Sequence, residues 1–381
     1  MNTAPPLSLY IHFPWCVKKC PYCDFNSHTL RQSLPEKEYI QHLLLNLEQW
    51  LPQIQEREII SIFFGGGTPS LLSPAAFEAL LKGLNKKLTL ASDIEVTMEA
   101  NPGTIEQSKF QGYFDIGVNR ISLGIQSFND TQLERLGRIH DARQAVSAIE
   151  AIKKAGFKNF NLDLMYGLPQ QTQEEAMTDI HTALSFQPPH LSWYQLTLEP
   201  NTYFYKHPPK LPPEQSMLEI ESSGLSQLEA AGFSRYEISA FSQNKPCRHN
   251  LNYWQFGDYL ALGAGAHGKI TNPETQEIIR FDNYRNPKQY MDHTKPYQRN
   301  HQVVDAKELA FEYMLNTLRL TQGTPLSEFE QRTFQPIHSI APKIKQAVDK
   351  KLLYPDALLL RATPLGLNYL NDLTLLFFSN E

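Results

Sequence analysis

The stretch IHFPWCVKKCPYCDF, residues 11–25, follows an apolar run and carries Cys16, Cys20 and Cys23 at the spacing CxxxCxxC. Three thiolates at this spacing can hold three irons of a 4Fe-4S cluster, and the fourth iron then has no protein ligand. That open iron can chelate the amino and carboxylate groups of S-adenosylmethionine and pass it an electron, which starts radical chemistry. The stretch therefore predicts an iron–sulfur site that binds a second cofactor.

A zinc site is the alternative interpretation of the same cysteines, with the fourth ligand supplied by His12 or His28. Structural zinc motifs usually consist of two paired half-sites, whereas the chain has one further cysteine, Cys247. A disulfide framework fits less well, because three of the four cysteines are so close in sequence that they would cross-link almost nothing. This use of cysteine indicates a reducing compartment.

The composition is that of an ordinary globular protein of two or three domains, with 381 residues, 41% of them hydrophobic and 20% charged. Lys and Arg (35) against Asp and Glu (40) give a net charge of −5, so no global basic field favours nucleic acid. We find no secretory signal and no apolar run near the roughly 18 residues of a spanning helix, and we expect a cytoplasmic protein. Composition does not decide whether the chain attaches peripherally to a membrane or forms homodimers.

Short apolar runs alternate with longer amphipathic stretches up to about residue 199, which is typical of βα units and a parallel sheet. The predicted strands cover 7–13, 61–64, 93–100, 120–126, 159–167 and 190–199. The helices between them include 38–51, 74–88, 142–156 and 173–186. Six such units predict an α/β fold with a partial (β/α)6 barrel, in which ligands gather at the carboxyl ends of the strands.

The predicted domains are a barrel core, a flanking extension and a small C-terminal domain, covering 1–206, 207–304 and 305–381. The Pro-rich stretch HPPKLPP (207–213) marks the first boundary. Residues 214–300 are predicted to add a helix and short strands beside the barrel mouth.

The C-terminal domain is predicted to be helical and to resemble a winged helix. We expect one helix at 307–320, a second around 338–350, a hairpin-like segment at 352–363 and an apolar helix at the end. Its 8 basic and 9 acidic residues provide no basic face, so we do not expect it to bind nucleic acid.

Glycine-rich and polar segments end the predicted strands, so that four separate segments meet at one rim. GGGTP (65–69) follows the second strand, where glycines let the backbone approach a ligand closely and offer N–H donors or C=O acceptors. A charged residue such as Glu99 is costly at a strand end unless it is paired, which favours a ligand role over a structural one. Gln126 is placed similarly, Arg138 can grip a carboxylate, and Asp163 can accept from ribose hydroxyls or a cationic centre.

Together these segments resemble the HemN-like branch of the radical SAM superfamily, the branch of the coproporphyrinogen III dehydrogenases. The likeness is carried by YIHFPWCVKKCPYCDF, FFGGGTPS, MEANPGT, NRISLGIQSF, LGRIH and NLDLMYGLP. Within that branch the chain is most similar to the heme chaperones, through PPHLSWYQLTLEPNT, CRHNLNYW and FGDYLALGAGAHGK. The likeness covers nearly the whole chain and implies a radical SAM barrel with a HemN-type C-terminal domain.

The resemblance implies that Cys16, Cys20 and Cys23 bind the cluster. It also implies contacts to S-adenosylmethionine from Tyr10, Tyr22, Gly66, Gly67, Thr68, Glu99, Gln126, Arg138 and Asp163. Two features depart from the dehydrogenases: Phe25 stands where they carry a further cysteine, and only nine residues precede Tyr10, whereas they carry an N-terminal extension. Both departures put the decarboxylation reaction in doubt and favour the chaperones.

The segment HNLNYW (249–254) combines a histidine that can ligate heme iron with Tyr253 and Trp254, flat side chains that suit a porphyrin face. By itself this pattern is more typical of a helix start with aromatic core residues. The resemblance to the chaperones implies instead that His249 binds heme. Cys247 and His267 are alternative axial ligands, although the glycines around His267 can also serve close approach of the backbone.

The function that we expect is heme trafficking: the chain binds heme and transfers it to apo heme proteins. On this interpretation the cluster and S-adenosylmethionine regulate assembly or transfer, and whether the chain is also an enzyme stays open. The alternative is an oxygen-independent coproporphyrinogen III oxidase, in which a radical derived from S-adenosylmethionine starts the loss of carbon dioxide from two propionate side chains.

Overall fold

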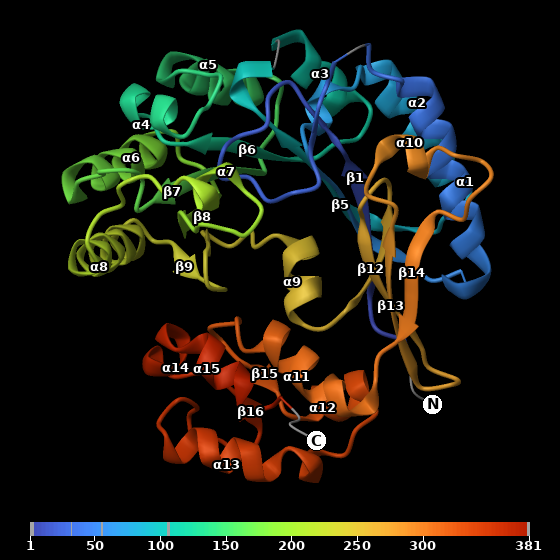
Figure 1. Cartoon of the computed structure of the whole chain (residues 1–381), viewed down its shortest axis with the longest axis vertical. Helices are drawn as coiled ribbons and strands as arrows, with labels where there is room; N and C mark the ends of the chain where they lie inside the picture. The colour runs from blue at the N-terminus through green and yellow to red at the C-terminus, as the bar shows by residue number, and fades with distance from the viewer. Residues whose placement is uncertain (1–3, 32, 55, 105–106, 379–381) are drawn as a thin grey trace.

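The apolar runs that were predicted as strands form a parallel sheet at the centre of the molecule (Figure 1). The computed structural model describes residues 4–31, 33–54, 56–104 and 107–378. Its parallel strands follow each other in the order β1 (Leu7–Phe13), β4 (Ile59–Gly66), β5 (Leu90–Ala100), β6 (Arg120–Gln126), β7 (Phe160–Tyr166) and β8 (His190–Gln195). The predicted α/β fold with a partial six-stranded barrel is confirmed.

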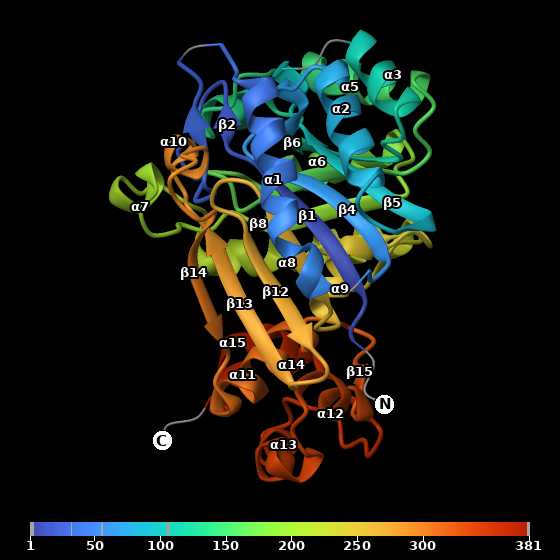
Figure 2. The ribbon, with the colours of Figure 1, turned by 90° about the vertical axis from the view of Figure 1, so that its right-hand side faces the viewer.

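Helices connect these strands and cover the outer face of the sheet (Figures 1 and 2). They are α1 (Glu36–Ile54), α2 (Pro74–Asn85), α3 (Gln107–Asp115), α4 (Asp130–Arg135), α5 (Ala142–Lys154) and α6 (Gln173–Ser185). Two of them begin with capping boxes, formed by Asp141 with Gln144 and by Thr172 with Glu175. Each box satisfies backbone N–H groups at the helix start, which is why these helices begin where they do.

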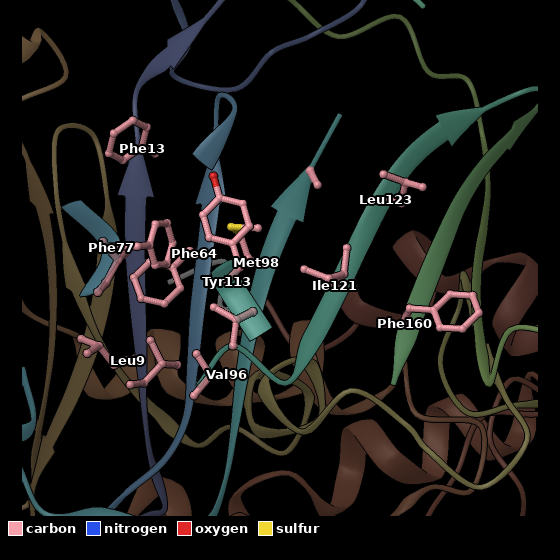
Figure 3. Packing of buried hydrophobic residues seen from close by; sticks show 14 of the residues in the cluster. Leu9, Phe13, Phe64, Phe77, Val96, Met98, Tyr113, Ile121, Leu123 and Phe160 are labelled. Carbon is pink, nitrogen blue, oxygen red and sulfur yellow. The ribbon is translucent and has the colours of Figure 1, made fainter. Parts of the chain in front are cut away.

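The strands alternate between apolar and polar residues, although buried parallel strands are usually apolar on both faces. In β6, Ile121 and Leu123 point to the helices, and Ser122 between them belongs to the other face. Figure 3 shows this outer layer, in which Phe77 of α2 packs on Phe64, with ring centroids 4.5 Å apart. The alternation arises because the other face lines the interior of the barrel, where polar side chains contact one another.

The sheet continues beyond the barrel at both edges and has twelve strands in the described part of the chain. On the β1 edge, β11 (Asp258–Leu262) adds a further parallel strand, followed by the antiparallel β12 (His267–Asn272), β13 (Glu277–Asn283) and β14 (Gln298–Val303). On the β8 edge lie β10 (Ala240–Ser242) and β9 (Ser234–Arg235), both antiparallel. The extension therefore joins the barrel sheet itself, whereas the sequence predicted short strands beside the mouth.

Short elements complete the barrel and its extension. They are β2 (Trp15–Cys16), β3 (His28–Thr29), η1 (Pro69–Leu71), η2 (Pro102–Thr104), α7 (Tyr203–Lys206), α8 (Glu214–Ala230), α9 (Arg248–Trp254) and α10 (Pro287–Tyr290). The strands β2 and β3 pair in parallel; β2 contains Cys16, and the other two cysteines of the motif lie between the strands. Helix α9 lies at the opposite end of the barrel, because its Asn252 donates to the hydroxyl of Ser8 near the start of β1.

The C-terminal residues form a helical unit with its own core, which includes Tyr313, Phe329 and Phe377. Its elements are α11 (Ala306–Thr317), β15 (Thr324–Pro325), α12 (Ser327–Thr333), η3 (Ile337–Ser339), α13 (Ala341–Asp349), β16 (Leu359–Leu360), α14 (Pro364–Asn368) and α15 (Leu370–Leu375). The two predicted helices are present, and the predicted terminal helix is divided into α14 and α15. Domain boundaries at 206 and 304 remain a prediction.

The hairpin-like segment predicted at 352–363 is present. An antiparallel bridge joins Leu353 to Ala362, the Tyr354 N–H donates to the Arg361 carbonyl and the Thr363 N–H donates to the Leu352 carbonyl, both at 3.0 Å. The Asp356 carboxylate accepts from the backbone N–H groups of residues 358 and 359 in the connecting turn, and Leu359 and Leu360 pair in addition with β15. No described helix is both long and apolar enough to cross a membrane.

Candidate iron–sulfur and cofactor site

The three cysteines of the CxxxCxxC motif lie together at the carboxyl end of β1 as free, half-buried thiols. The hydroxyl of Thr68 donates to Cys16 Sγ over 3.5 Å, and Cys23 Sγ lies 3.8 Å from the Ser27 hydroxyl. Burial raises the pKa of Cys16 and of Cys23, so these thiols hold their protons until a metal displaces them. Three sulfur donors in one loop fit a cluster with one open iron.

The zinc alternative finds no support in the positions of the two histidines. Both ring nitrogens of His12 are engaged, one with the Tyr10 hydroxyl at 2.9 Å and the other with the Asn26 carbonyl at 2.8 Å. His28 Nε2 lies 3.2 Å from the carbonyl of Arg285. Within the described ranges, no three His, Cys, Asp or Glu side chains are arranged to hold a single metal ion.

The glycine turn after β4 packs closely against the segment that leads to the cysteines. Gly66 has a φ of 111°, and a Cβ there would lie 2.4 Å from the His12 ring. A Cβ on Gly67 would lie 2.5 Å from the carbonyl oxygen of Trp15. Only glycine fits both positions, so the turn is built for close approach of the backbone.

The N–H groups of this turn are used within the chain. Gly66 N–H donates to Glu99 Oε2 at 3.1 Å, and the N–H groups of Gly67 and Thr68 donate to the carbonyls of Phe13 and Trp15, at and just after the end of β1, at 2.6 and 2.8 Å. From the sequence, either the N–H donors or the C=O acceptors of this turn could contact a ligand. With its donors occupied, the turn can offer a ligand carbonyl oxygens, which suit an ammonium group.

Glu99 and Tyr10 flank the first glycine of the turn. A Cβ on Gly65 would lie 3.1 Å from the Tyr10 ring and 3.2 Å from the Glu99 carboxyl carbon. Burial, reinforced by the nearby Asp163 carboxylate, raises the pKa of Glu99 to about 8. The carboxyl is therefore mostly neutral at pH 7, and a cation bound beside it would draw its proton off.

Asp163 lies deeper in the barrel, at the centre of a small hydrogen-bond network. It accepts from the Ser122 hydroxyl at 3.0 Å and from the Asn161 amide at 2.8 Å. Burial raises its pKa, and these hydrogen bonds oppose that shift. A carboxyl supported in this way can still accept from a hydroxyl or pair with a cationic centre.

Arg138 contacts the cysteine loop directly. Its Nη1 lies 3.5 Å from Cys20 Sγ and 3.4 Å from the Tyr22 hydroxyl, and its Nη2 donates to the Gly124 carbonyl at 2.8 Å. The sequence had suggested a carboxylate as the partner of this guanidinium. The structure instead places its N–H groups where they can donate to a cluster thiolate.

Gln126 ends β6 with a φ of 69°, at a point where the register to β7 shifts. Its side-chain oxygen accepts from the Tyr194 hydroxyl at 2.9 Å. A left-handed conformation at a residue other than glycine is strained, and such strain is common at functional sites.

The structure thus brings the predicted rim residues together through a chain of contacts. Thr68 joins the glycine turn to Cys16, Arg138 joins Cys20 to Tyr22, and Glu99 bonds to Gly66. The roles of the individual residues in binding remain predictions.

His249 lies on α9 at the opposite end of the barrel and points into its interior, where its ring centroid is 6.3 Å from that of Tyr10. Its Nδ1 is 3.0 Å from the Ser61 hydroxyl, its Nε2 is 2.8 Å from the Tyr253 hydroxyl, and its ring stacks on Phe63 with centroids 5.0 Å apart. Burial lowers its pKa to about 3. The imidazole is therefore neutral, as an iron ligand must be, but its Nε2 can bind iron only after the contact with Tyr253 is broken.

The two alternative axial ligands differ in position and chemistry. Cys247 is buried beside Glu95, and burial raises the pKa of its thiol to about 12, which disfavours the thiolate needed for ligation. His267 is exposed and begins β12, directly after the carboxyl end of β11. Since β11 runs parallel to β1, this residue lies at the rim and away from His249.

The glycines near His267 serve close approach of the backbone, as one of the two sequence-based interpretations held. A Cβ on Gly263 would lie 2.4 Å from the His12 carbonyl oxygen, and one on Gly265 would lie 2.3 Å from Asn26. The Asn26 amide in turn donates to the carbonyls of Ala264 and Arg285, each at 2.9 Å. These bonds attach the cysteine loop to the extension.

Several contact residues were not singled out from the sequence: Ser61, Phe63, Asn26 and Tyr194. Ser61 and Phe63 belong to a run of alternating residues in β4, and that alternation is the signal that could have placed them inside the barrel. Phe63 also stacks on Tyr10, with centroids 6.3 Å apart, so the rim and α9 share one wall of the barrel. Asn26 and Tyr194 carry no comparable signal.

Comparison with known proteins agrees with this arrangement. The model of the radical SAM superfamily matches residues 10–183, and the model of the HemN C-terminal domain matches residues 304–368. The structure of coproporphyrinogen III oxidase (HemN) from Escherichia coli superposes with a TM-score of 0.84 at 22% identity, covering 99% of this chain and 91% of that one. This likeness concerns the fold alone.

Sequence relatives are similar over the whole length. Heme chaperone HemW from Haemophilus influenzae and HemW from Escherichia coli are each 47% identical to this chain, with complete coverage of both chains. HemW from Bacillus subtilis is 35% identical over 91% of this chain and 92% of its own length. The chain therefore belongs to the HemW family of the radical SAM superfamily.

Proposed function

We propose that this protein is a heme chaperone, which binds heme at α9 and passes it to apo heme proteins. The observation that carries the proposal is the 47% identity to proteins named heme chaperones, extending over the full length of both chains. The segment HNLNYW lies within that shared length. We further propose that transfer takes place in the cytosol, since three of the four cysteines are too close in sequence to form a disulfide framework, which indicates a reducing compartment.

Cys16, Cys20 and Cys23 would hold a 4Fe-4S cluster. When bound, the cluster offers its open iron to S-adenosylmethionine and supplies the electron for its cleavage. The chain's own part is to position the ligand. Glu99 and the carbonyls of the glycine turn suit its ammonium group, Tyr10 closes the wall beside them, and Asp163 accepts hydrogen bonds from deeper in the barrel.

The remaining rim residues would orient the cluster loop and the ligand. Thr68 and Arg138 donate to two of the three sulfurs, and Tyr22 and Gln126 extend this network toward Tyr194. Hydrogen bonds to thiolates make a cluster easier to reduce, so these donors would set its potential.

At α9, His249 would ligate heme through Nε2 once the Tyr253 hydroxyl has moved. The surroundings keep the imidazole neutral over the whole physiological pH range. Because the Ser61 hydroxyl holds Nδ1, the ring keeps its orientation when Nε2 changes partner. Tyr253 would thus act as a placeholder for the metal.

An anaerobic heme titration of cluster-reconstituted protein, followed at the Soret band, tests this function. We expect saturable binding by the wild type, clearly weaker binding by His249→Phe, which keeps the volume of the ring, and unchanged binding by the surface control His181→Ala. Absence of saturable binding in the wild type would refute the proposal. An assay for decarboxylation of coproporphyrinogen III would then be the next step.

A further inference from the structure

Helix α9 is held between the barrel and the C-terminal helices (Figure 1). Its inner side contacts the barrel through His249 and Ser61. Its outer end continues into Phe256, whose ring packs on Tyr313 of α11 with centroids 5.5 Å apart. Helix α9 and the residues that follow it therefore contact the C-terminal part as well as the barrel.

Two N–H donors without partners lie at this outer end. The guanidinium of Arg319, just after α11, stands 4.3 Å from the ring centroid of Trp254 at the end of α9. The Nε of Arg319 and the indole Nε1 of Trp254 are both buried without a hydrogen-bond acceptor among the described residues. Buried donors are nearly always satisfied, so two unpartnered donors in one contact can accommodate an acceptor from outside the chain, an anion or water.

Two of the other arginines near α9 are already committed to carboxylates. Arg248 bonds to the carboxylate of Asp93 at 2.5 Å, and Arg280 bonds to Glu312. Arg319 has one described hydrogen bond, a longer contact of 3.3 Å with Glu237.

Glu237 itself is shared between several donors. Its second oxygen accepts from the backbone N–H and the hydroxyl of Ser239, both at 3.0 Å. A guanidinium has five donors, so Arg319 keeps capacity for a further anion. Its side chain is 28% exposed, which leaves it within reach of a ligand.

We propose that Arg319 binds a propionate carboxylate of heme at the outer end of α9, with the indole N–H of Trp254 as a second donor. Heme carries two propionates, and the fork of a guanidinium matches a carboxylate in geometry and charge. His249 would then recognise the metal and Arg319 the carboxylate. This pair selects iron porphyrins with free carboxylates over esterified or apolar ones.

The inference rests on the proposed heme function, and its test separates the two. Heme and its dimethyl ester, which lacks the charged carboxylates, are titrated under the same conditions into the wild type and into Arg319→Gln. Loss of one charge-assisted pair is expected to weaken heme binding about ten-fold. The wild type should bind heme about ten-fold tighter than the ester, and Arg319→Gln should lose most of this preference, with its affinity for the ester unchanged.

Arg361→Gln is the matched control. Its guanidinium stands 4.4 Å from the Tyr354 ring, and its Nε is likewise buried without a described partner, but both residues belong to the C-terminal unit. It should keep the preference of the wild type for heme. Trp254→Phe, which keeps an aromatic ring and removes the indole N–H, should lose part of that preference.

Three results would overturn the inference. If the wild type binds heme and ester equally, no carboxylate is recognised. If Arg319→Gln weakens the binding of both ligands to the same extent, Arg319 only holds α9 against the C-terminal helices. Thermal unfolding of Arg319→Gln and of Arg319→Lys would then show that loss of packing as a lower melting temperature. If the wild type binds neither ligand, the proposed function fails together with the inference.

Discussion

Replacing Glu99 with Gln should remove a pH dependence from the binding of S-adenosylmethionine. Glu99 lies beside the glycine turn, faces Tyr10 and Asp163, and has a pKa of about 8 because it is buried. A cationic ligand needs the carboxylate, yet well below pH 8 the ionised fraction falls ten-fold with each pH unit. The apparent affinity of the wild type should therefore rise about ten-fold between pH 6 and pH 7.

The assay is isothermal calorimetry on cluster-reconstituted protein, at pH 6 and 7, in two buffers of different ionisation enthalpy. Wild type should release about one more proton on binding than Glu99→Gln does, because the variant has no carboxyl to ionise. The ligand's own amino group titrates in both proteins and cancels in the comparison. 5′-Deoxyadenosine, which lacks the amino acid part, should bind without this difference. Equal pH dependence in the two proteins would refute the assignment of Glu99.

Three further outcomes follow from the contacts at the rim. Because the pKa of Glu99 is raised, the folded state binds more protons than the unfolded state between pH 4.5 and about 8, and this group makes the folded state less stable as the pH rises. In urea unfolding, the free energy of unfolding of Glu99→Gln should therefore increase relative to that of the wild type from pH 5 to pH 8. Thr68→Val removes the hydrogen bond to Cys16 and should lower the cluster reduction potential in an EPR-monitored titration, whereas Thr68→Ser should not. Gly66 has a φ of 111°, and a Cβ at this position would lie 2.4 Å from the His12 ring. Gly66→Ala should therefore destabilise the fold by about 1–3 kcal/mol and reduce the cluster absorbance after reconstitution.

Much of the barrel could be predicted from the sequence because its strands carry local signals. The predicted bounds of β1 and β6, at 7–13 and 120–126, are those of the structure, since both strands are buried runs with turn residues at their ends. The pairing of β11 with β1 could not be predicted in this way. It joins segments about 250 residues apart, and nothing local in FGDYLAL indicates a partner.

In the candidate site, too, the features with a local sequence signal could be predicted and those that depend on distant segments could not. Residues at strand ends, such as Glu99 and Gln126, were predicted to meet because the carboxyl ends of parallel strands meet at one edge. The burial of His249 was not predicted, since it depends on α9 closing the far end of the barrel against Ser61 and Phe63. The contact between Arg138 and Cys20 likewise depends on the conformation of a loop, which the spacing of residues in the sequence does not reveal.

Transfer of heme to an acceptor tests the central claim most directly. Protein loaded with heme and freed of excess ligand is mixed with the apo form of a b-type heme protein, and the Soret band of the acceptor is followed at increasing acceptor concentration. The account predicts that the transfer rate rises with acceptor concentration, and that His249→Phe, which retains little heme, transfers little. A rate that stays constant at all acceptor concentrations, set only by loss of heme into solution, would contradict a chaperone.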